Sequence, residues 1–414
     1  MKKKSVKKKI RPIRLQPIEC NQFKKKSKKK SKKKENNKTH HINTSEYEFT
    51  YRPIKYKNNT ISMDIELYRW ISIDTLKQNI LDTFNKYKIK PIKGDLKSNI
   101  DNMIARMLFD ILSKDNIKKL DDGLLNFSDV SVLNDLNTTF NIEKNMIKPI
   151  YDELDIDGYI KIRLKTMKEM KKMPQKNQVK IYINNNKMTT EFLHNNKLHK
   201  IQIPFAVYDK LKKRYAEYPD QDNDLNELVA CLCLRYDALG SIGNQMGIPI
   251  PIKDKLKDCR VNFEGFASAL NHHCYYYCSM FYDIEKYFGS IGLYQNIKYI
   301  RGTFMLNPPY EKSLLHRMVS KIIKSLDVSK SDLCFLFGTP TWDSYKEITF
   351  HMDANESKYF KLKFRFDNYQ VWWYDFIKEV YTKIPSSTRY ILANYNMDTK
   401  CLQNAIKDWI ELQV

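Results

Sequence analysis

One short segment of the chain combines residue types that can methylate an amine: Asn307-Pro308-Pro309-Tyr310. The side-chain oxygen of Asn307 and the backbone carbonyl of Pro308 can accept the two hydrogens of an aromatic amine, whose lone pair is otherwise delocalised into its ring. Tandem prolines fix φ and hold these acceptors in place before the substrate arrives. Tyr310 can stack on the target base, an interaction worth roughly 1–3 kcal/mol. The tetrapeptide therefore predicts methyl transfer to the exocyclic amine of a nucleobase, with an ordinary Pro-Pro turn as the alternative.

The neighbours of this loop place it between a strand and a helix. The apolar run Tyr299–Leu306 predicts a strand that ends at the loop, and the segment after it predicts an amphipathic helix with Glu311 favourably placed in its first turn. One face of that helix is formed by Leu314, Leu315, Met318, Ile322, Ile323 and Leu326. Open α/β sheets present ligand-binding groups at the carboxyl ends of their strands, so this context favours catalysis.

From about residue 256 onward, short apolar runs alternate with helical stretches, which predicts an α/β sheet. Val261–Phe266 is expected to form the first strand, Ala269–Met280 a helix and Met280–Ile284 a second strand. Leu333–Phe337 and Arg389–Ala393 are further strand candidates.

The cofactor is expected at the ends of the earlier strands. Phe266, Ala267 and Ser268 form a turn of mainly small residues ahead of the expected helix, where backbone can approach a ligand, although the segment contains no GxGxxG pattern. Asp283, near the end of the expected second strand, is a candidate for holding ribose hydroxyls, as acidic residues do in dinucleotide folds. A solvated loop aspartate is an equal alternative.

Residues 46–255 predict an α-rich accessory domain without a catalytic motif of its own. Helical stretches include Ile104–Leu112 and Leu225–Leu239. Gln178–Asn184 alternates like a strand and is followed by a turn at Asn185 and Asn186, which indicates a small sheet among the helices.

The formal net charge of +24 is concentrated at one end of the chain. Residues 1–40 contain 18 Lys and Arg against two Glu, which leaves +16 there and +8 for the rest. Residues 1–45 are therefore expected to be a disordered polylysine tail. Such a tail associates with nucleic acid through counterion release, either as an RNA tether or as part of a nuclear-import signal. A purely solubilising tail is the alternative.

The eight cysteines are scattered along the chain, and no apolar run is long enough for a membrane span or a signal peptide. We therefore expect a reduced intracellular compartment and no membrane association. His272, His273, Cys274 and Cys278 crowd one stretch but lack the paired C-x2–4-C spacing of structural zinc sites, so no metal is expected.

Four ordered motifs resemble those of the phosphorylated-CTD-interacting-factor family, the cap-specific adenosine N6-methyltransferases. They are FEGFASALN at Phe263–Asn271, YYYCSMFYD at Tyr275–Asp283, YFGS at Tyr287–Ser290 and GTFMLNPPY at Gly302–Tyr310. The family carries similar FASPLN, CSAFPD, YFGS and NPPF segments in the same order. Weaker similarity extends to FLFGTPTW at Phe335–Trp342. Ala269 stands where the family has proline, and Tyr310 replaces phenylalanine while keeping a stacking ring.

The resemblance implies a Rossmann-type class I methyltransferase domain at residues 256–414, with S-adenosylmethionine as the methyl donor. It implies N6-methylation of the cap-adjacent 2′-O-methyladenosine of capped mRNA. Together with the strand-end positions, it assigns the cofactor to Phe266, Ala267, Ser268, Asn271, Asp283, Phe288, Gly289 and Asn307. The substrate is assigned to Tyr310, Glu311 and Trp342. No WW module is found in the sequence, so WW-mediated binding to phosphorylated polymerase tails is not expected.

Two alternative functions remain open. The same loop occurs in N6-adenine methyltransferases that act on DNA or internal RNA. A catalytically silent cap- or RNA-binding protein is the other alternative, against which the intact loop argues. The polybasic tail favours a nuclear location, whereas the bias toward Lys, Asn and Ile is also compatible with a viral protein of the cytoplasm.

Overall fold

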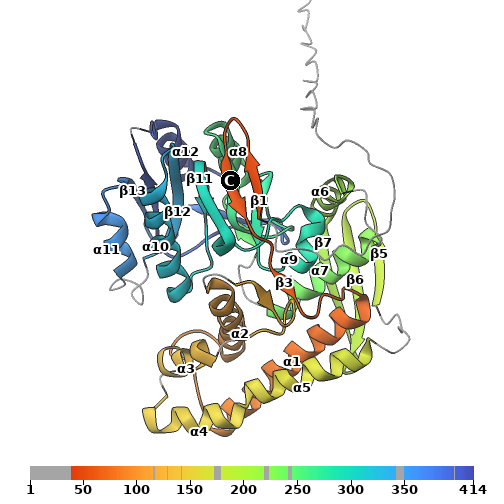
Figure 1. Cartoon of the computed structure of the whole chain (residues 1–414). Helices are drawn as coiled ribbons and strands as arrows, with labels where there is room; N and C mark the ends of the chain where they lie inside the picture. Colours follow the sequence, from red (N-terminus) through yellow and green to blue (C-terminus); the bar gives the residue numbers. More distant parts are fainter. Residues whose placement is uncertain are drawn as a thin grey trace, which may run out of the picture. The chain divides into compact units, whose positions relative to one another are not determined.

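A mixed sheet of eight strands organises the chain in this computed structural model (Figure 1). The structure describes residues 39–114, 117–127, 129–140, 142–171, 179–218, 223–240, 245–341, 349–395 and 397–414. Most of the tail predicted for residues 1–45 therefore lies outside the described residues. Strand β1 (His40–Asn43) falls inside that range, so the folded part of the chain begins earlier than predicted.

The core of the sheet runs in the order β10 (Tyr276–Ser279), β9 (Val261–Ala267), β11 (Ile297–Leu306), β12 (Leu333–Pro340), β16 (Ser387–Ala393) and β13 (Phe360–Phe366). The first four strands are parallel, whereas β16 is antiparallel to both of its neighbours. Strand β9 comes first in the chain but lies between β10 and β11, so the strand order reverses there. The carboxyl ends of strands at such a reversal form the usual ligand-binding crevice of open α/β sheets.

Apolar side chains alternate between the two faces of the sheet, and helices cover both. Phe335 and Phe337 of β12 pack in the core under α10 (Lys312–Val328) and α11 (Thr349–Glu356). Leu336 of the same strand packs in the opposite core under α8 (Ile250–Asp258) and α12 (Lys400–Glu411). The predicted α/β class and the amphipathic helix after Tyr310 are confirmed.

An N-terminal hairpin extends the sheet. Strand β2 (Glu48–Tyr51) pairs with β1 and with the first half of β11, both antiparallel. Tyr47, just before β2, is buried, and its hydroxyl donates to the Thr303 carbonyl at 2.7 Å. Gly302 is required opposite it, because its φ is +121° and a Cβ there would press on the Tyr47 ring. Residues near 46, predicted to begin the accessory domain, thus belong to the main sheet.

The helix predicted at Ala269–Met280 and the strand predicted at Met280–Ile284 are both wrong. The second parallel strand is β10, which starts at Tyr276, and α9 (Tyr282–Glu285) follows it. A run of tyrosines favours a strand over a helix when their rings can pack on a pleated surface. Tyr277 is fully buried, with its ring stacked on His272 at a centroid distance of 4.1 Å.

Most of the residues before β9 form helices and two small sheets. The helices are α1 (Met63–Lys86), α2 (Leu96–Ser113), α3 (Asp129–Thr138), α4 (Lys144–Leu154), α5 (Ile156–Met170), α6 (Phe205–Ala216) and α7 (Leu225–Leu239). The antiparallel sheet β5 (Val179–Ile183), β6 (Lys187–His194) and β7 (Lys197–Pro204) confirms the predicted hairpin, and β3 (Lys55–Tyr56) pairs with β4 (Lys119–Leu120). The domain boundary predicted at residue 255 stays a prediction.

None of the described helices has the length and hydropathy needed to cross a membrane.

Two further features complete the region around β13 and α12. Strands β8 (Met246–Gly247), β14 (Trp372–Asp375) and β15 (Val380–Lys383) form a separate three-stranded sheet. A disulfide joins Cys259, just after α8, to Cys401 in α12, with a Cα–Cα distance of 5.5 Å. The expectation of reduced cysteines missed this pair because the two residues are 142 positions apart in sequence. The other described cysteines are free and buried.

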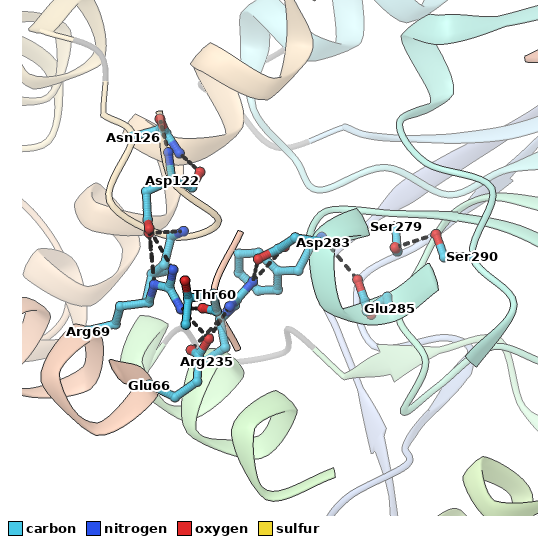
Figure 2. A network of polar contacts seen from close by, with 12 residues as sticks. Thr60, Glu66, Arg69, Asp122, Asn126, Arg235, Ser279, Asp283, Glu285 and Ser290 are labelled. Carbon is cyan, nitrogen blue, oxygen red and sulfur yellow. Dashed lines mark hydrogen bonds and ion pairs between the residues drawn. The ribbon is translucent and has the colours of Figure 1, made fainter. Parts of the chain in front are cut away.

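A chain of five buried charges connects α1, α7 and α9 (Figure 2). Arg69 donates to Asp122 through Nε at 2.9 Å and through Nη2 at 2.6 Å. Glu66 lies between Arg69 and Arg235 and forms ion pairs with both. Arg235 closes the chain by donating from Nη1 to both carboxylate oxygens of Asp283, at 2.6 and 2.7 Å.

The alternation of charges keeps this chain ionised. Burial alone would raise the pKa of Asp122, but the charge and hydrogen bonds of Arg69 outweigh it, and the pKa lies below the ordinary aspartate value. Burial likewise opposes the charge on Arg235, yet Asp283 and Glu66 hold its pKa well above the usual range. Gly123 packs against the Arg235–Asp283 pair, where a Cβ would overlap both side chains.

We predict that Arg235→Ala lowers the free energy of unfolding by about 3–5 kcal/mol, because it leaves Glu66 and Asp283 buried without their shared cation. Denaturant unfolding followed by far-UV circular dichroism measures this loss. Arg365→Ala is the matched control, since Arg365 is exposed and its nearest carboxylate, Asp367, lies at 3.5 Å. A change below about 0.5 kcal/mol is expected for the control. Equal effects of the two variants would contradict a structural role for the charge chain.

Candidate active site

The Asn307–Tyr310 loop connects the carboxyl end of β11 to α10, as predicted. Glu311 is the N-cap of α10, and its carboxylate accepts from the backbone N–H groups of Ser313 at 2.9 Å and Leu314 at 2.6 Å. This cap fixes the direction in which the loop leaves the strand. The substrate role predicted for the Glu311 side chain competes with this capping role, although the residue does line the cavity described next.

A cavity of about 710 Å³ opens at the carboxyl ends of β9 and β11, where the strand order reverses. Ligand sites of this size are typical for small molecules and cofactors. The predicted residues that line it are Phe266, Ala267, Ser268, Asn271, Asn307, Pro308, Pro309, Tyr310 and Glu311. The structure therefore brings the predicted catalytic loop and four predicted cofactor positions to one cavity.

Asn307, which lines this cavity, has an unused acceptor. Its Oδ1 atom is buried and has no hydrogen-bond partner among the described residues. A buried polar atom left unpaired costs about 1–3 kcal/mol, so its presence at a cavity wall needs a reason. A ligand N–H group is the partner that a carbonyl-type oxygen requires.

The turn after β9 is fixed by hydrogen bonds within itself. Asn271 Oδ1 accepts from the Ser268 N–H at 2.8 Å, and Ser268 Oγ accepts from the Asn271 N–H at 3.1 Å. The buried Glu285 carboxylate accepts from the Ala269 N–H at 2.8 Å and from the Tyr236 hydroxyl at 3.0 Å. Burial raises the pKa of Glu285, which these donors oppose.

Three predicted cofactor residues do not line the cavity. Asp283 lies in α9, beyond the end of β10, and its carboxylate is paired with Arg235. Its prediction assumed a strand at Met280–Ile284, whereas the strand ends at Ser279, which does line the cavity. Phe288 is fully buried in the core, and Gly289 has a φ of +93° beside the Arg214 guanidinium. Trp342 lies outside the described residues.

Helix α2 forms one wall of the cavity, and its contribution was not predicted. Its inward face consists of Asn102, Ala105, Arg106, Phe109, Leu112 and Ser113. Their spacing places them on one face of the helix, so the sequence shows an amphipathic pattern there. That pattern does not distinguish a face that lines a ligand cavity from a face that packs in the core. The Nη2 atom of Arg106 is buried without a partner among the described residues.

The β14–β15 hairpin also lines the cavity, through Trp373, Asp375, Lys378, Val380, Thr382 and Lys383. Lys383 lies over the Trp372 ring at 4.5 Å from its centroid. Trp373 packs against Trp409 with centroids 5.2 Å apart, so it mainly fills the core. Lys383 adds a positive charge to this part of the cavity, whereas Lys378 is paired with Asp375 at 3.8 Å and Arg106 with Asp135 at 2.9 Å.

The histidine- and cysteine-rich stretch packs largely in the core. His272 Nδ1 bonds to the Cys274 carbonyl at 3.1 Å, and both side chains are buried. Burial and the nearby charge of Lys210 hold the pKa of His272 well below its usual value. Among the residues that the structure describes, no three His, Cys, Asp or Glu side chains are arranged to hold a metal ion.

Comparison with known proteins supports the resemblance that the motifs indicated. Residues 206–375 match the model of the family described as "Phosphorylated CTD interacting factor 1 WW domain". The chain is 36% identical over 121 residues to the mouse protein named mRNA (2′-O-methyladenosine-N(6)-)-methyltransferase. It is 35% identical over 121 residues to the human protein of the same name. These matches confirm the predicted similarity to the phosphorylated-CTD-interacting-factor family.

The matches cover limited parts of the chains. Each includes 28% of this chain and 17% of the relative. The chain thus spans about a sixth of the length of the curated relatives that it matches. Because the matched family model is named for a WW domain, the expected absence of WW-mediated polymerase-tail binding gains no support from the comparison.

Proposed function

We propose that this chain, whose residues 206–375 match the phosphorylated-CTD-interacting-factor family, transfers a methyl group from S-adenosylmethionine to the N6 amine of an adenosine. The observation that carries the proposal is the buried, unpartnered Oδ1 of Asn307 at the wall of the cavity. The names of the mouse and human relatives support N6 of 2′-O-methyladenosine as the target.

The chemistry follows from where the loop puts its acceptors. The Asn307 side-chain oxygen accepts one amine hydrogen and the Pro308 carbonyl accepts the other, which draws the nitrogen toward tetrahedral geometry and exposes its lone pair. No base is needed before attack, because the proton leaves after the new N–C bond has formed. Tyr310, which is half-buried at the cavity, stacks on the base and holds it in register. When bound, the sulfonium donor supplies an electrophilic methyl group.

The strand arrangement favours a Rossmann-type class I methyltransferase domain. Phe266, Ala267, Ser268 and Asn271 follow the first parallel strand and line the cavity beside the catalytic loop. These residues would hold the donor in the same cavity as Asn307, where it would supply the methyl group. Ser279 replaces Asp283 as the residue at the end of the next strand.

Capped mRNA is the substrate that the relatives' names and the charge distribution favour together. Lys383 lines the cavity and provides positive charge for a polyphosphate-linked cap, whereas the nearby Arg106 and Lys378 are paired with carboxylates. We propose that the lysine-rich segment before residue 39 acts as a sequence-independent RNA tether and that the protein works inside the cell. Its placement in nucleus or cytoplasm follows from whether that segment also serves as an import signal.

We predict that Asn307→Ala reduces kcat for methyl transfer by several orders of magnitude, because one of the two amine acceptors is lost. A radiolabelled-methyl assay with capped, 2′-O-methylated RNA that starts with adenosine measures this. Far-UV circular dichroism and the thermal unfolding midpoint serve as the folding control and should match the wild type. Retention of near-wild-type kcat would refute the proposed role of Asn307.

Substitution of Tyr310 separates stacking from the hydroxyl group. Tyr310→Phe should keep most of the activity, since the ring is retained. Tyr310→Ala should raise the KM for RNA by about 5- to 150-fold, which corresponds to the loss of roughly 1–3 kcal/mol of stacking. If Phe and Ala variants are equally impaired, the ring does not stack on the base.

Substrate class is decided by competition in a single reaction. Capped A-starting RNA, its uncapped form and an adenine-containing DNA duplex are offered together, and product is quantified for each. We expect methylation of the capped RNA to exceed the other two by at least about tenfold in kcat/KM, because discrimination against a missing polar recognition element commonly reaches that size. Equal transfer to the three would replace cap specificity with general N6-adenine methylation.

A further inference from the structure

The turn after β9 is held from behind by two lysines. Lys210 of α6 donates from Nζ to the Leu270 carbonyl at 2.9 Å and to the His272 carbonyl at 3.0 Å. Lys253 of α8 donates to the Asn271 carbonyl between them at 3.0 Å. Three consecutive carbonyls thus receive hydrogen bonds from two ammonium groups, so the carbonyl side of the turn is satisfied by side chains from other elements.

Acidic groups hold the N–H side of the same turn. Glu264 of β9 accepts from the His273 N–H at 3.2 Å and from the Cys274 N–H at 3.4 Å. It also pairs with Lys253 at 3.2 Å. With Glu285 on the Ala269 N–H, side chains from outside the turn anchor it at both ends.

The two lysines differ in their access to a ligand. Lys253 lines the cavity and can contact whatever binds there, whereas Lys210 does not line it. The turn residues Ser268 and Asn271 do line the cavity. Any influence of Lys210 on a ligand therefore passes through the backbone of the turn.

We propose that Lys210 is a positioning residue for the cofactor: its ammonium fixes the Ser268–Cys274 turn in the shape that binds S-adenosylmethionine. This inference rests on the proposed methyltransferase function. It predicts that loss of Lys210 weakens cofactor binding without removing any atom that touches the cofactor.

The electrostatic surroundings of Lys210 make this brace sensitive to pH. Lys253 of α8, Arg214 of α6 and His272 of the turn are its basic neighbours, and Glu264 of β9 is the acidic one. Desolvation lowers the pKa of Lys210 to about 7, with Lys253 acting in the same direction and Glu264 opposing it. Charge-assisted hydrogen bonds are roughly twice as strong as neutral ones, so the brace weakens as pH rises through this value.

A rise in pH weakens the hydrogen bonds from Lys210 to the turn but increases the contribution of Lys210 to the stability of the fold. Between about 7 and 10.5 the unfolded chain keeps a proton on Lys210 that the folded chain has released. The contribution of Lys210 to the free energy of unfolding therefore increases with pH in that interval. Cofactor affinity, by contrast, is expected to decrease with pH. A purely structural role for Lys210 cannot produce that decrease.

The test measures binding of S-adenosylhomocysteine by calorimetry at several pH values from 6 to 8.5, with the full chain. For the wild type we expect affinity to fall several-fold with a midpoint near the Lys210 pKa of about 7. Lys210→Met should bind about tenfold more weakly at pH 6 and show no such step, since two charge-assisted hydrogen bonds are lost. Lys210→Arg should restore binding and remain flat with pH, because arginine keeps its charge.

Lys212→Met is the matched control, because Lys212 lies on the same helix and is exposed. It should reproduce the wild-type profile. Lys210→Met binding that equals wild type at every pH would overturn the positioning role alone. A wild type that fails to bind S-adenosylhomocysteine would overturn the proposed function and this inference together. If Lys210→Met does not fold, Lys210→Arg provides the test. A fall in S-adenosylhomocysteine affinity with pH in Lys210→Arg that matches the wild type would overturn the inference.

Discussion

The buried chain Asp122–Arg69–Glu66–Arg235–Asp283 is the constraint on which the arrangement around the cavity depends. Each interior member needs both neighbours, so no element can shift without leaving a charge unpaired in a dry environment. The chain ties α1 and α7 to α9, which directly follows strand β10 of the main sheet. Asp283 completes the chain through its pair with Arg235 and does not line the cavity.

The charge chain also helps to hold together the distant segments that line the cavity. Helix α2 packs against α1 and α7, which the charge chain joins, and also against α10, which follows the catalytic loop. Its inward face, the turn after β9 and the β14–β15 hairpin come from distant parts of the sequence. A site assembled in this way keeps its shape only if the helices cannot rotate against the sheet. Directional ion pairs between buried side chains prevent that rotation.

The sequence predicted elements correctly where burial of one face leaves a regular pattern of apolar residues. The strand–loop–helix around Asn307 was predictable because burial of β11 and amphipathicity of α10 both leave strong periodic signals. It failed between Ala269 and Ile284, where a tyrosine run forms a strand and the register of β10 moves Asp283 out of the site. The α2 wall and the Cys259–Cys401 pair depend on contacts between distant segments, which no local pattern records. The lysine brace is invisible for the same reason: Lys210 lies on a helix like any amphipathic lysine.

The two loops of the site are held rigid by different means. In the Ser268–Cys274 turn, buried carboxylates and ammonium groups from other elements hold the backbone from behind, so the turn is rigid before any ligand arrives. In the Asn307–Tyr310 loop, the prolines supply rigidity, and Asn307 Oδ1 is buried without a hydrogen-bond partner. The cost of that unpaired acceptor, about 1–3 kcal/mol, is recovered when a donor occupies it. In the proposed mechanism, a donor with two hydrogens on one nitrogen recovers most, because the Pro308 carbonyl accepts the second hydrogen. On that proposal the loop favours a primary amine over a hydroxyl or a ring N–H.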